Sequence, residues 1–184
     1  GSTRVLRAMR RRHTREEYLD LVERIRTAIP TIALSTDIIV GFPGETEEEF
    51  QETLSLVQQA GFSSMFSFKY SERATTLASR RMPETVSERE KTRRIVELQS
   101  MQRTIQFDLN RQSVGTTASV LADNTSRRRD SELSGRTGGN LVVNFPGKPS
   151  WVGSLVSVRI KRAGPHSVWG ESVALGEAEQ INAN

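Results

Sequence analysis

Cysteine is absent from the 184 residues of this chain, and histidine occurs only twice. The lack of cysteine excludes a disulfide framework, a thiol nucleophile and a thiolate metal site within these residues. His13 and His166 lie far apart in the sequence, so we expect no metal site from this chain alone. No apolar run approaches the length of a membrane span, and the arginine-rich start does not resemble a signal peptide. We therefore expect a cytoplasmic globular protein.

The net charge of +4 hides a separation of charge along the chain. Residues 1–12 carry +5, residues 13–110 carry −4, residues 111–171 carry +5 and the remaining residues carry −2. This separation indicates two parts with different partners, because a basic part suits a polyanion such as RNA or DNA. Runs of arginine also occur on solvated surfaces without a partner, and that interpretation stays open.

Residues 33–50 (ALSTDIIVGFPGETEEEF) combine a buried strand, a glycine turn and the start of a helix. The apolar run at 38–40 is typical of a parallel strand covered on both faces. The glycines and proline at 41–44 let the backbone turn and let a ligand approach it closely. Thr46 and Glu49 form a capping box for the helix that follows. This stretch is our candidate ligand site, although strand, turn and helix also occur as plain architecture.

Acidic side chains at the helix start decide which ligand this turn suits. A phosphate bound to the turn would meet Glu45 and the carboxylates of residues 47–49 within one helical turn. The turn also lacks the Lys-Ser or Lys-Thr pair of a triphosphate loop and the glycine spacing of a dinucleotide site. We therefore expect a neutral or cationic ligand.

The other segments before residue 111 predict alternating helices and strands. Thr14 begins a second capping box, whose helix Pro30 ends, and Gly61 is a natural end for the helix that starts at Thr46. Residues 66–70 alternate apolar and polar side chains as a strand does, and Ser87 begins a long helix. The pattern predicts an α/β fold with parallel strands.

The pattern changes to short strands divided by turn residues after Gly115. Strands are expected at 117–121, 133–137, 141–145, 151–160 and 167–170. Five such segments indicate a small antiparallel β-barrel that is closed or nearly closed. We therefore predict a first domain at 1–110, a β-barrel at 111–172 and a polar tail at 173–184.

Two parallel strands with apolar faces and unpaired edges do not make a finished sheet. We therefore infer that further strands precede these residues in the natural protein, and that residues 1–12 derive from a strand. An open edge also invites self-association through the sheet.

Several separated motifs, in this order, resemble the radical S-adenosylmethionine methylthiotransferases. The motifs are GSTRVL at 1–6, MRRRHTREEY at 9–18, STDIIVGFPGET at 35–46, FKYS at 68–71 and GRTGGNLVVNF at 135–145. The resemblance covers residues 1 to about 171. Residues 72–77 (ERATTL) depart from the proline-rich turn that is usual in the family.

The resemblance implies the C-terminal part of a parallel (β/α) partial barrel followed by a TRAM domain, an OB-like RNA-binding β-barrel. It implies the cofactors S-adenosylmethionine and [4Fe–4S] clusters, and 2-methylthiolation of isopentenyl-adenosine beside the anticodon of tRNA. The cluster cysteines are absent from these residues, so we expect this chain alone to be inactive. Its implied partners are the anticodon stem-loop of tRNA and the N-terminal half of the same protein.

The resemblance also suggests which residues contact the cofactor. Residues 41–43 correspond to the family segment along the adenosyl group, and Thr36 and Asp37 lie beside that pocket. Asp37 is alternatively an acceptor for loop amides. Arg11 either holds the cofactor carboxylate or is a surface arginine. The candidate cofactor residues are Arg11, Thr36, Asp37, Gly41, Phe42 and Pro43.

Basic and amide side chains of the barrel are the candidate RNA contacts. One group is expected on or beside one turn of the barrel and the other on a second turn, where they can contact phosphates and base edges. The candidates are Arg136, Asn140, Asn144 and Lys148 in the first group, and Arg127, Arg128 and Arg129 in the second. Phe145 and Trp151 are expected to fill the barrel core rather than to stack on bases.

Two alternative functions stay open. The family resemblance also permits methylthiolation of a ribosomal protein, although the basic barrel favours nucleic acid. A free-standing RNA-binding module without catalysis is the other alternative.

Overall fold

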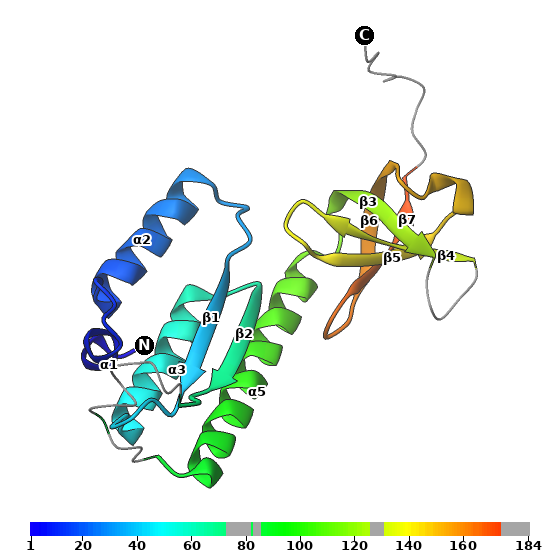
Figure 1. The fold of residues 1–184 in the computed structure, drawn as a ribbon. Coiled ribbons are helices and arrows are strands. Elements are labelled where there is room, and N and C mark those ends of the chain that lie inside the picture. The colour runs from blue at the N-terminus through cyan, green and yellow to red at the C-terminus, as the bar shows by residue number, and fades with distance from the viewer. Residues whose placement is uncertain (73–81, 83–85, 126–130, 174–184) are drawn as a thin grey trace. The chain divides into compact units, whose positions relative to one another are not determined.

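The computed structural model describes residues 1–72, 82, 86–125 and 131–173 (Figure 1). The chain divides into two compact units, Gly1–Gln106 and Phe107–Asn184, and each is described by itself. Three sequence-based expectations lie outside the described residues. They concern the turn at 73–77, the arginines at 127–129 and the polar tail from residue 174 onward.

Helices α2 (Arg15–Ala28) and α3 (Glu47–Ala60) begin and end where the sequence predicts. Each starts with a complete capping box, in which a threonine side chain and a glutamate side chain satisfy each other's backbone N–H groups. Gly61 ends α3 with φ of 52° and ψ of 58°, a left-handed conformation that glycine adopts without a Cβ penalty. Local sequence therefore determines the limits of both helices.

Residues 1–12 contain a helix rather than the expected strand. Helix α1 (Thr3–Ala8) begins at Ser2, whose hydroxyl accepts a hydrogen bond from the N–H of Val5. Ser2 is also a buried partner of Glu49, and its Oγ lies 3.0 Å from Glu49 Oε1. The prediction of a strand was wrong because an N-cap serine, tied to another helix, favours a helical turn here.

Strands β1 (Ser35–Val40) and β2 (Ser64–Lys69) form the predicted parallel pair, with Ser35 opposite Ser64 and Val40 opposite Lys69. One face of the pair packs on a core built from α2, α3, the N-terminal unit's part of α5 (Glu88–Gln112) and the chain after Gly61 (Figure 1). The buried residues of this core are Val22, Val40, Phe50, Leu54, Leu56, Val57, Ala60, Phe62 and Leu98.

The opposite face of the β1–β2 pair is exposed in the described part of the chain. Ile39 is 39% exposed, Phe66 65% and Phe68 52%. Ile39 pairs with Phe68 and Asp37 pairs with Phe66, so these four side chains share one face. The helices of the described residues therefore leave this face uncovered, in line with the expectation that they supply too little cover for both faces.

Helix α5 is the long helix that the sequence predicts, and the unit boundary after Gln106 falls within it. The Ser87 hydroxyl accepts a hydrogen bond from the N–H of Glu90 at 3.2 Å, which is half of the expected capping box. The carboxylate of Glu90 instead binds Arg93 and Arg94. No helix in the described residues is long and apolar enough to cross a membrane.

The second unit contains a closed five-stranded barrel in the order β3-β4-β5-β7-β6. The strands are β3 (Thr117–Thr125), β4 (Glu132–Thr137), β5 (Val142–Pro146), β6 (Leu155–Ala163) and β7 (Val168–Ser172). Four pairings are antiparallel, but β5 and β7 are parallel. The prediction of a wholly antiparallel barrel is corrected, because strand directions cannot alternate all the way around a ring of five.

The barrel core is small and apolar. Phe145 is fully buried and Trp151 packs against it, as expected, although Trp151 belongs to a 3-10 helix (Pro149–Trp151) rather than to a strand. The buried members of this core are Val120, Ala122, Leu133, Val143, Phe145, Val158, Ile160 and Val168.

Candidate cofactor loop and candidate RNA surface

The loop after β1 is held in one conformation by its own backbone and by Glu45. Gly41 has φ of +73°, and its N–H donates to Glu45 Oε2 at 2.6 Å. The N–H of Glu45 in turn donates to the carbonyl of Phe42 at 2.9 Å. The loop therefore satisfies part of its own hydrogen bonding, and it follows β1 at the carboxyl end of the parallel pair, where α/β folds place ligands.

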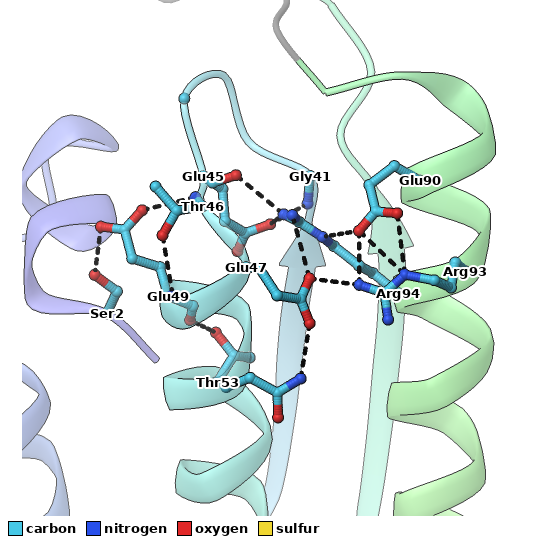
Figure 2. Close-up of polar contacts among 12 residues, drawn as sticks. Ser2, Gly41, Glu45, Thr46, Glu47, Glu49, Thr53, Glu90, Arg93 and Arg94 are labelled. Carbon is cyan, nitrogen blue, oxygen red and sulfur yellow. Dashed lines mark hydrogen bonds and ion pairs between the residues drawn. The ribbon is translucent and has the colours of Figure 1, made fainter.

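A buried ion pair joins this loop to α5 (Figure 2). Arg94 Nη1 lies 2.9 Å from Glu45 Oε2 and 3.1 Å from the Glu45 carbonyl oxygen. Both side chains are almost completely buried, with 5% of Arg94 and 2% of Glu45 exposed. Burial raises the pKa of Glu45, and the hydrogen bonds from Gly41 and Arg94 oppose that rise. The carboxylate depends on these donors to remain charged.

Lys91 occupies the space beside Gly41. A Cβ at position 41 would lie 2.5 Å from Lys91 Cγ, and the lysine side chain is 1% exposed. Its Nζ donates to the carbonyl of Tyr70 at 3.2 Å and to Glu88 at 3.0 Å. We expected the glycine to allow a ligand to approach the backbone, but in the structure it is Lys91 that approaches.

An aromatic contact joins the loop to the residue that follows β2. Phe42 is buried and meets Tyr70 edge to face, with ring centroids 5.3 Å apart. Beside Tyr70, a hollow of about 610 Å³ opens at the carboxyl end of β2. Its lining consists of Ser67, Phe68, Lys69, Tyr70, Ser71, Glu72, Glu88, Lys91 and Ile95. The structure thus places a hollow next to the loop that the sequence singles out.

Glu49 ties the start of α3 to α1. Its carboxylate accepts hydrogen bonds from Ser2, from the guanidinium of Arg4 and from the backbone N–H of Thr46. The hydrogen bond from Arg4 is the main cause that lowers the pKa of Glu49 to about 2. Glu49, one of the acidic residues at the start of α3, therefore anchors α1 through Ser2 and Arg4.

Replacing Glu49 with glutamine is expected to change how the N-terminal unit responds to acid. Because folding lowers the pKa of Glu49 from 4.5 to about 2, its carboxylate stabilises the folded state fully at pH values above 4.5. That contribution is lost as the pH falls toward 2. Because Arg4 is 56% exposed and partly screened, we expect E49Q to cost about 2 kcal/mol at pH 7, including part of the cap. Urea unfolding followed by helical circular dichroism at pH 7 and pH 3 measures both values.

The matched control for E49Q is Glu52→Gln, an exposed position on the same helix. E52Q should change the free energy of unfolding by less than about 0.5 kcal/mol. The difference in the free energy of unfolding between wild type and E49Q should be smaller at pH 3 than at pH 7. A gap that stays constant between the two pH values would show that Glu49 acts by packing rather than by charge.

The predicted cofactor residues do not form one cluster. Thr36 is partly buried toward the core, whereas Asp37 lies on the exposed face of the sheet. Asp37 was expected either to lie beside the cofactor or to accept hydrogen bonds from loop amides. The hydrogen bond from the N–H of Gly41 goes to Glu45 rather than to Asp37. Arg11 is exposed after α1, and its N–H donates to the carbonyl of Leu6.

Of the predicted RNA residues, the four that the structure describes extend from the end of β4 along β5 and just beyond it. Arg136 Nη1 donates to Asn140 Oδ1 at 2.8 Å across the turn between β4 and β5. Asn140 has φ of +64°, which asparagine tolerates better than most residues. Asn144 lies within β5, and Lys148 follows the far end of that strand. Lys148 therefore does not lie on or beside the turn that holds Asn140, and the expectation of one shared turn is wrong for that residue.

Sequence reasoning missed three residues that fix the cofactor loop: Glu45 as an amide acceptor, Lys91 and Arg94. The two basic residues are close in sequence to Glu88 and Glu90, and such spacing usually marks an exposed helix face. The one available signal was that Glu45 follows a strand and turn expected to be buried, because a buried carboxylate needs a cation nearby. In the described residues, no three histidine, aspartate or glutamate side chains gather as a metal site.

Comparison with known proteins gives two family matches. Residues 1–57 match the Radical SAM superfamily, and residues 111–173 match the TRAM domain. A tRNA-2-methylthio-N(6)-dimethylallyladenosine synthase of Magnetococcus marinus is 47% identical over 173 residues, which are 94% of this chain and 39% of that protein. The protein of the same name from Geobacter metallireducens is 46% identical over 93% of this chain and 38% of its own length.

The chain thus spans less than two fifths of the length of these relatives, while the relatives cover nearly all of it. The fold agrees with both family matches, because parallel strands with helices precede a closed barrel. The chain therefore combines a segment of the Radical SAM superfamily with a TRAM domain that follows it.

Proposed function

We propose that this chain supplies the RNA-holding barrel and part of the cofactor wall of a cytoplasmic tRNA methylthiotransferase, which adds a methylthio group to isopentenyl-adenosine beside the anticodon. The observation that carries the proposal is the 47% identity to a tRNA-2-methylthio-N(6)-dimethylallyladenosine synthase over 94% of the chain. In this assignment, residues 1–110 belong to the radical SAM domain, residues 111–172 form the RNA-binding barrel and residues 173–184 are a polar tail.

The proposed cofactor residues are the loop 41–43 with Thr36, Asp37 and Arg11, of which Thr36 faces the core and Asp37 the exposed face of the sheet. Support comes from the position of the loop at the carboxyl end of β1 and from its attachment to α5 through Glu45 and Arg94. S-adenosylmethionine and a [4Fe–4S] cluster supply the radical chemistry of such enzymes. The 184 residues contain no cysteine, so the cluster ligands lie elsewhere and this chain alone should not cleave the cofactor.

The exposed sheet face needs a polypeptide partner. Phe66 and Phe68 expose more than half of their surface there, and contact between apolar side chains and water is unfavourable. The relatives are more than twice as long as this chain, so the N-terminal part of such an enzyme is the partner assigned to this face. Self-association of isolated chains through the same face and edge is expected at high concentration.

The RNA surface comprises Arg136, Asn140, Asn144 and Lys148, together with the arginines at 127–129. Arg136 near the end of β4, Asn140 in the turn that follows and Lys148 after β5 are all exposed. Arginine and lysine contact phosphates, whereas asparagine contacts base edges and sugar hydroxyls. The match to the TRAM domain supports this assignment.

RNA binding is tested with the full chain and an anticodon stem-loop RNA at rising salt. If three or four phosphates are neutralised, affinity should fall roughly 30- to 100-fold between 50 and 200 mM salt. Reversing the charge of Arg136 and Lys148 together should weaken binding and make the salt dependence shallower. Affinity that does not depend on salt would contradict the proposal. Preferential binding of a ribosomal-protein substrate would also contradict it, and would favour methylthiolation of a ribosomal protein.

A further inference from the structure

Four side chains form a row across the outer face of the barrel. Ser134 on β4 is opposite Asn144 on β5, Asn144 is opposite Trp169 on β7, and Trp169 is opposite Arg162 on β6. Their neighbours in sequence Gly135, Val143 and Val168 are buried, so the row itself faces outward. Two polar side chains, an indole and a guanidinium therefore lie side by side on one surface.

The indole of Trp169 is fixed from two directions. Its Nε1–H donates to Glu132 Oε1 at 3.0 Å, and Glu132 is buried. The guanidinium carbon of Arg162 lies 4.2 Å from the centre of the indole, which is the geometry of a cation–π contact. The indole thus supports the Arg162 guanidinium on the outer surface of the barrel.

An irregularity in β6 turns several cations toward the solvent. The register of β6 with β7 shifts between Ile160 and Arg162, and the bulge leaves both Lys161 and Arg162 exposed. Arg159 is also exposed on the same strand. The outer surface of β6 therefore combines one stacked arginine with two cations that are not stacked on a ring in the described structure.

We propose that the Arg162 guanidinium, supported by Trp169, is a stacking platform for an unpaired nucleobase of RNA. The guanidinium carbon lies over the indole and the Arg162 side chain is exposed, and unpaired bases stack on guanidinium planes as they do on aromatic rings. Asn144 and Ser134, next in the row, supply donors and acceptors for the edge of that base. This inference rests on the proposed RNA-binding function and identifies single-stranded RNA as what this face binds.

Charge alone does not explain the arrangement, since a phosphate contact needs only a mobile cation. Lys161, which pairs with Glu171 at 3.5 Å, and Arg159 already offer such cations on the same strand. Preorganising a guanidinium plane is useful for a flat ligand, because less side-chain freedom is lost on binding. A planar nucleobase fits that requirement.

The test compares Arg162→Lys with Arg159→Lys in the full chain. Both substitutions keep the charge, but only R162K removes a guanidinium plane that is stacked on an indole. Affinity is measured for an anticodon stem-loop and for a fully paired RNA hairpin of equal length. Stacking on one base is worth roughly 5- to 150-fold in affinity, so R162K should lose at least about fivefold for the stem-loop and less than about twofold for the duplex. R159K should stay within about twofold for both RNAs.

A second measurement follows the indole N–H signal of Trp169 by NMR, with Trp151→Phe used to assign it. The stem-loop should shift this signal, and the duplex should not. If wild type binds the stem-loop but R162K and R159K behave alike, the stacking platform is overturned and RNA binding stands. Equal losses for both RNAs in R162K would also overturn it, because they indicate a phosphate contact or a folding defect. If wild type binds neither RNA, the proposed function itself fails.

Discussion

Replacing Arg94 with methionine is expected to destabilise the N-terminal unit by about 3–5 kcal/mol. The substitution leaves the carboxylate of Glu45 buried without its counter-charge, since only 2% of that side chain is exposed. Glu45 cannot move to water freely, because its Oε2 holds the N–H of Gly41 at 2.6 Å. Urea unfolding followed by helical circular dichroism measures the loss.

The neighbouring residue provides the matched control. Arg93 makes ion pairs with Glu47, Glu90 and Glu97, but 44% of its side chain is exposed. Ion pairs at such exposure contribute little, so R93M should cost less than about 1 kcal/mol. A loss in R94M no larger than that in R93M would contradict the role assigned to the buried pair.

A double substitution separates charge from packing. Glu45→Gln combined with R94M removes both charges and keeps an acceptor for the amide of Gly41. Replacing a buried ion pair with neutral groups is often close to neutral, so the double variant should recover most of the loss. Lowering the pH should also reduce the difference in the free energy of unfolding between R94M and wild type. Burial already raises the pKa of Glu45, so its carboxylate takes up a proton readily, and protonation removes the unpaired charge.

Both units can be followed separately in one sample. The two tryptophans, Trp151 and Trp169, lie in the barrel, whereas α1, α2 and α3 lie in the N-terminal unit. Tryptophan fluorescence therefore reports on the barrel, and helical circular dichroism reports mainly on the first unit. R94M should move the circular dichroism transition and leave the fluorescence transition in place.

Local rules predicted the elements whose limits depend on nearby residues. Capping boxes at Thr14 and Thr46 and the left-handed Gly61 predicted the ends of α2 and α3 correctly. Residues 1–12 were wrongly predicted, because the helix there depends on a contact between Ser2 and Glu49, 47 residues apart. Such a contact has no local signature.

Barrel closure shows a second limit of sequence patterns. Alternation predicted the barrel strands, but alternation does not say which strands become neighbours. The parallel pairing of Val143 with Val168 follows only once the five strands are known to close into a ring. The number of strands, rather than any residue, determines that one pair must be parallel.

The sequence predicted the strand and turn of the candidate cofactor loop but not the contacts that hold the loop. The apolar run and the glycines predicted a strand followed by a turn, but no local pattern indicated that Lys91 and Arg94 hold this loop. On the barrel, attention to Phe145 and Trp151 as the aromatic residues overlooked Trp169. Its significance comes from pairing across strands with Arg162, and the strand register was not available from sequence.

Replacing Gly135 with alanine is expected to destabilise the barrel by about 3 kcal/mol. A Cβ at this position would lie 2.3 Å from the carbonyl oxygen of Leu121 and 2.7 Å from Val120 Cγ1. The carbonyl belongs to the paired strand β3, so it cannot move without breaking the strand pairing on which the closed barrel depends. The fluorescence transition should move to lower urea while the helical transition stays unchanged.

Gly138, in the turn between β4 and β5, is the matched control for this substitution. A Cβ there meets nothing within 4 Å, so G138A should change stability by less than about 1 kcal/mol in either direction. Because Ser134 and Arg136 flank Gly135 on β4, a shift of that strand would displace the outer surface as well, and G135A should also weaken binding of the stem-loop RNA. Equal stability of G135A and G138A would mean that β3 and β4 separate without cost. In that case the closed barrel would not hold its outer face rigidly enough to preorganise Arg162 on Trp169.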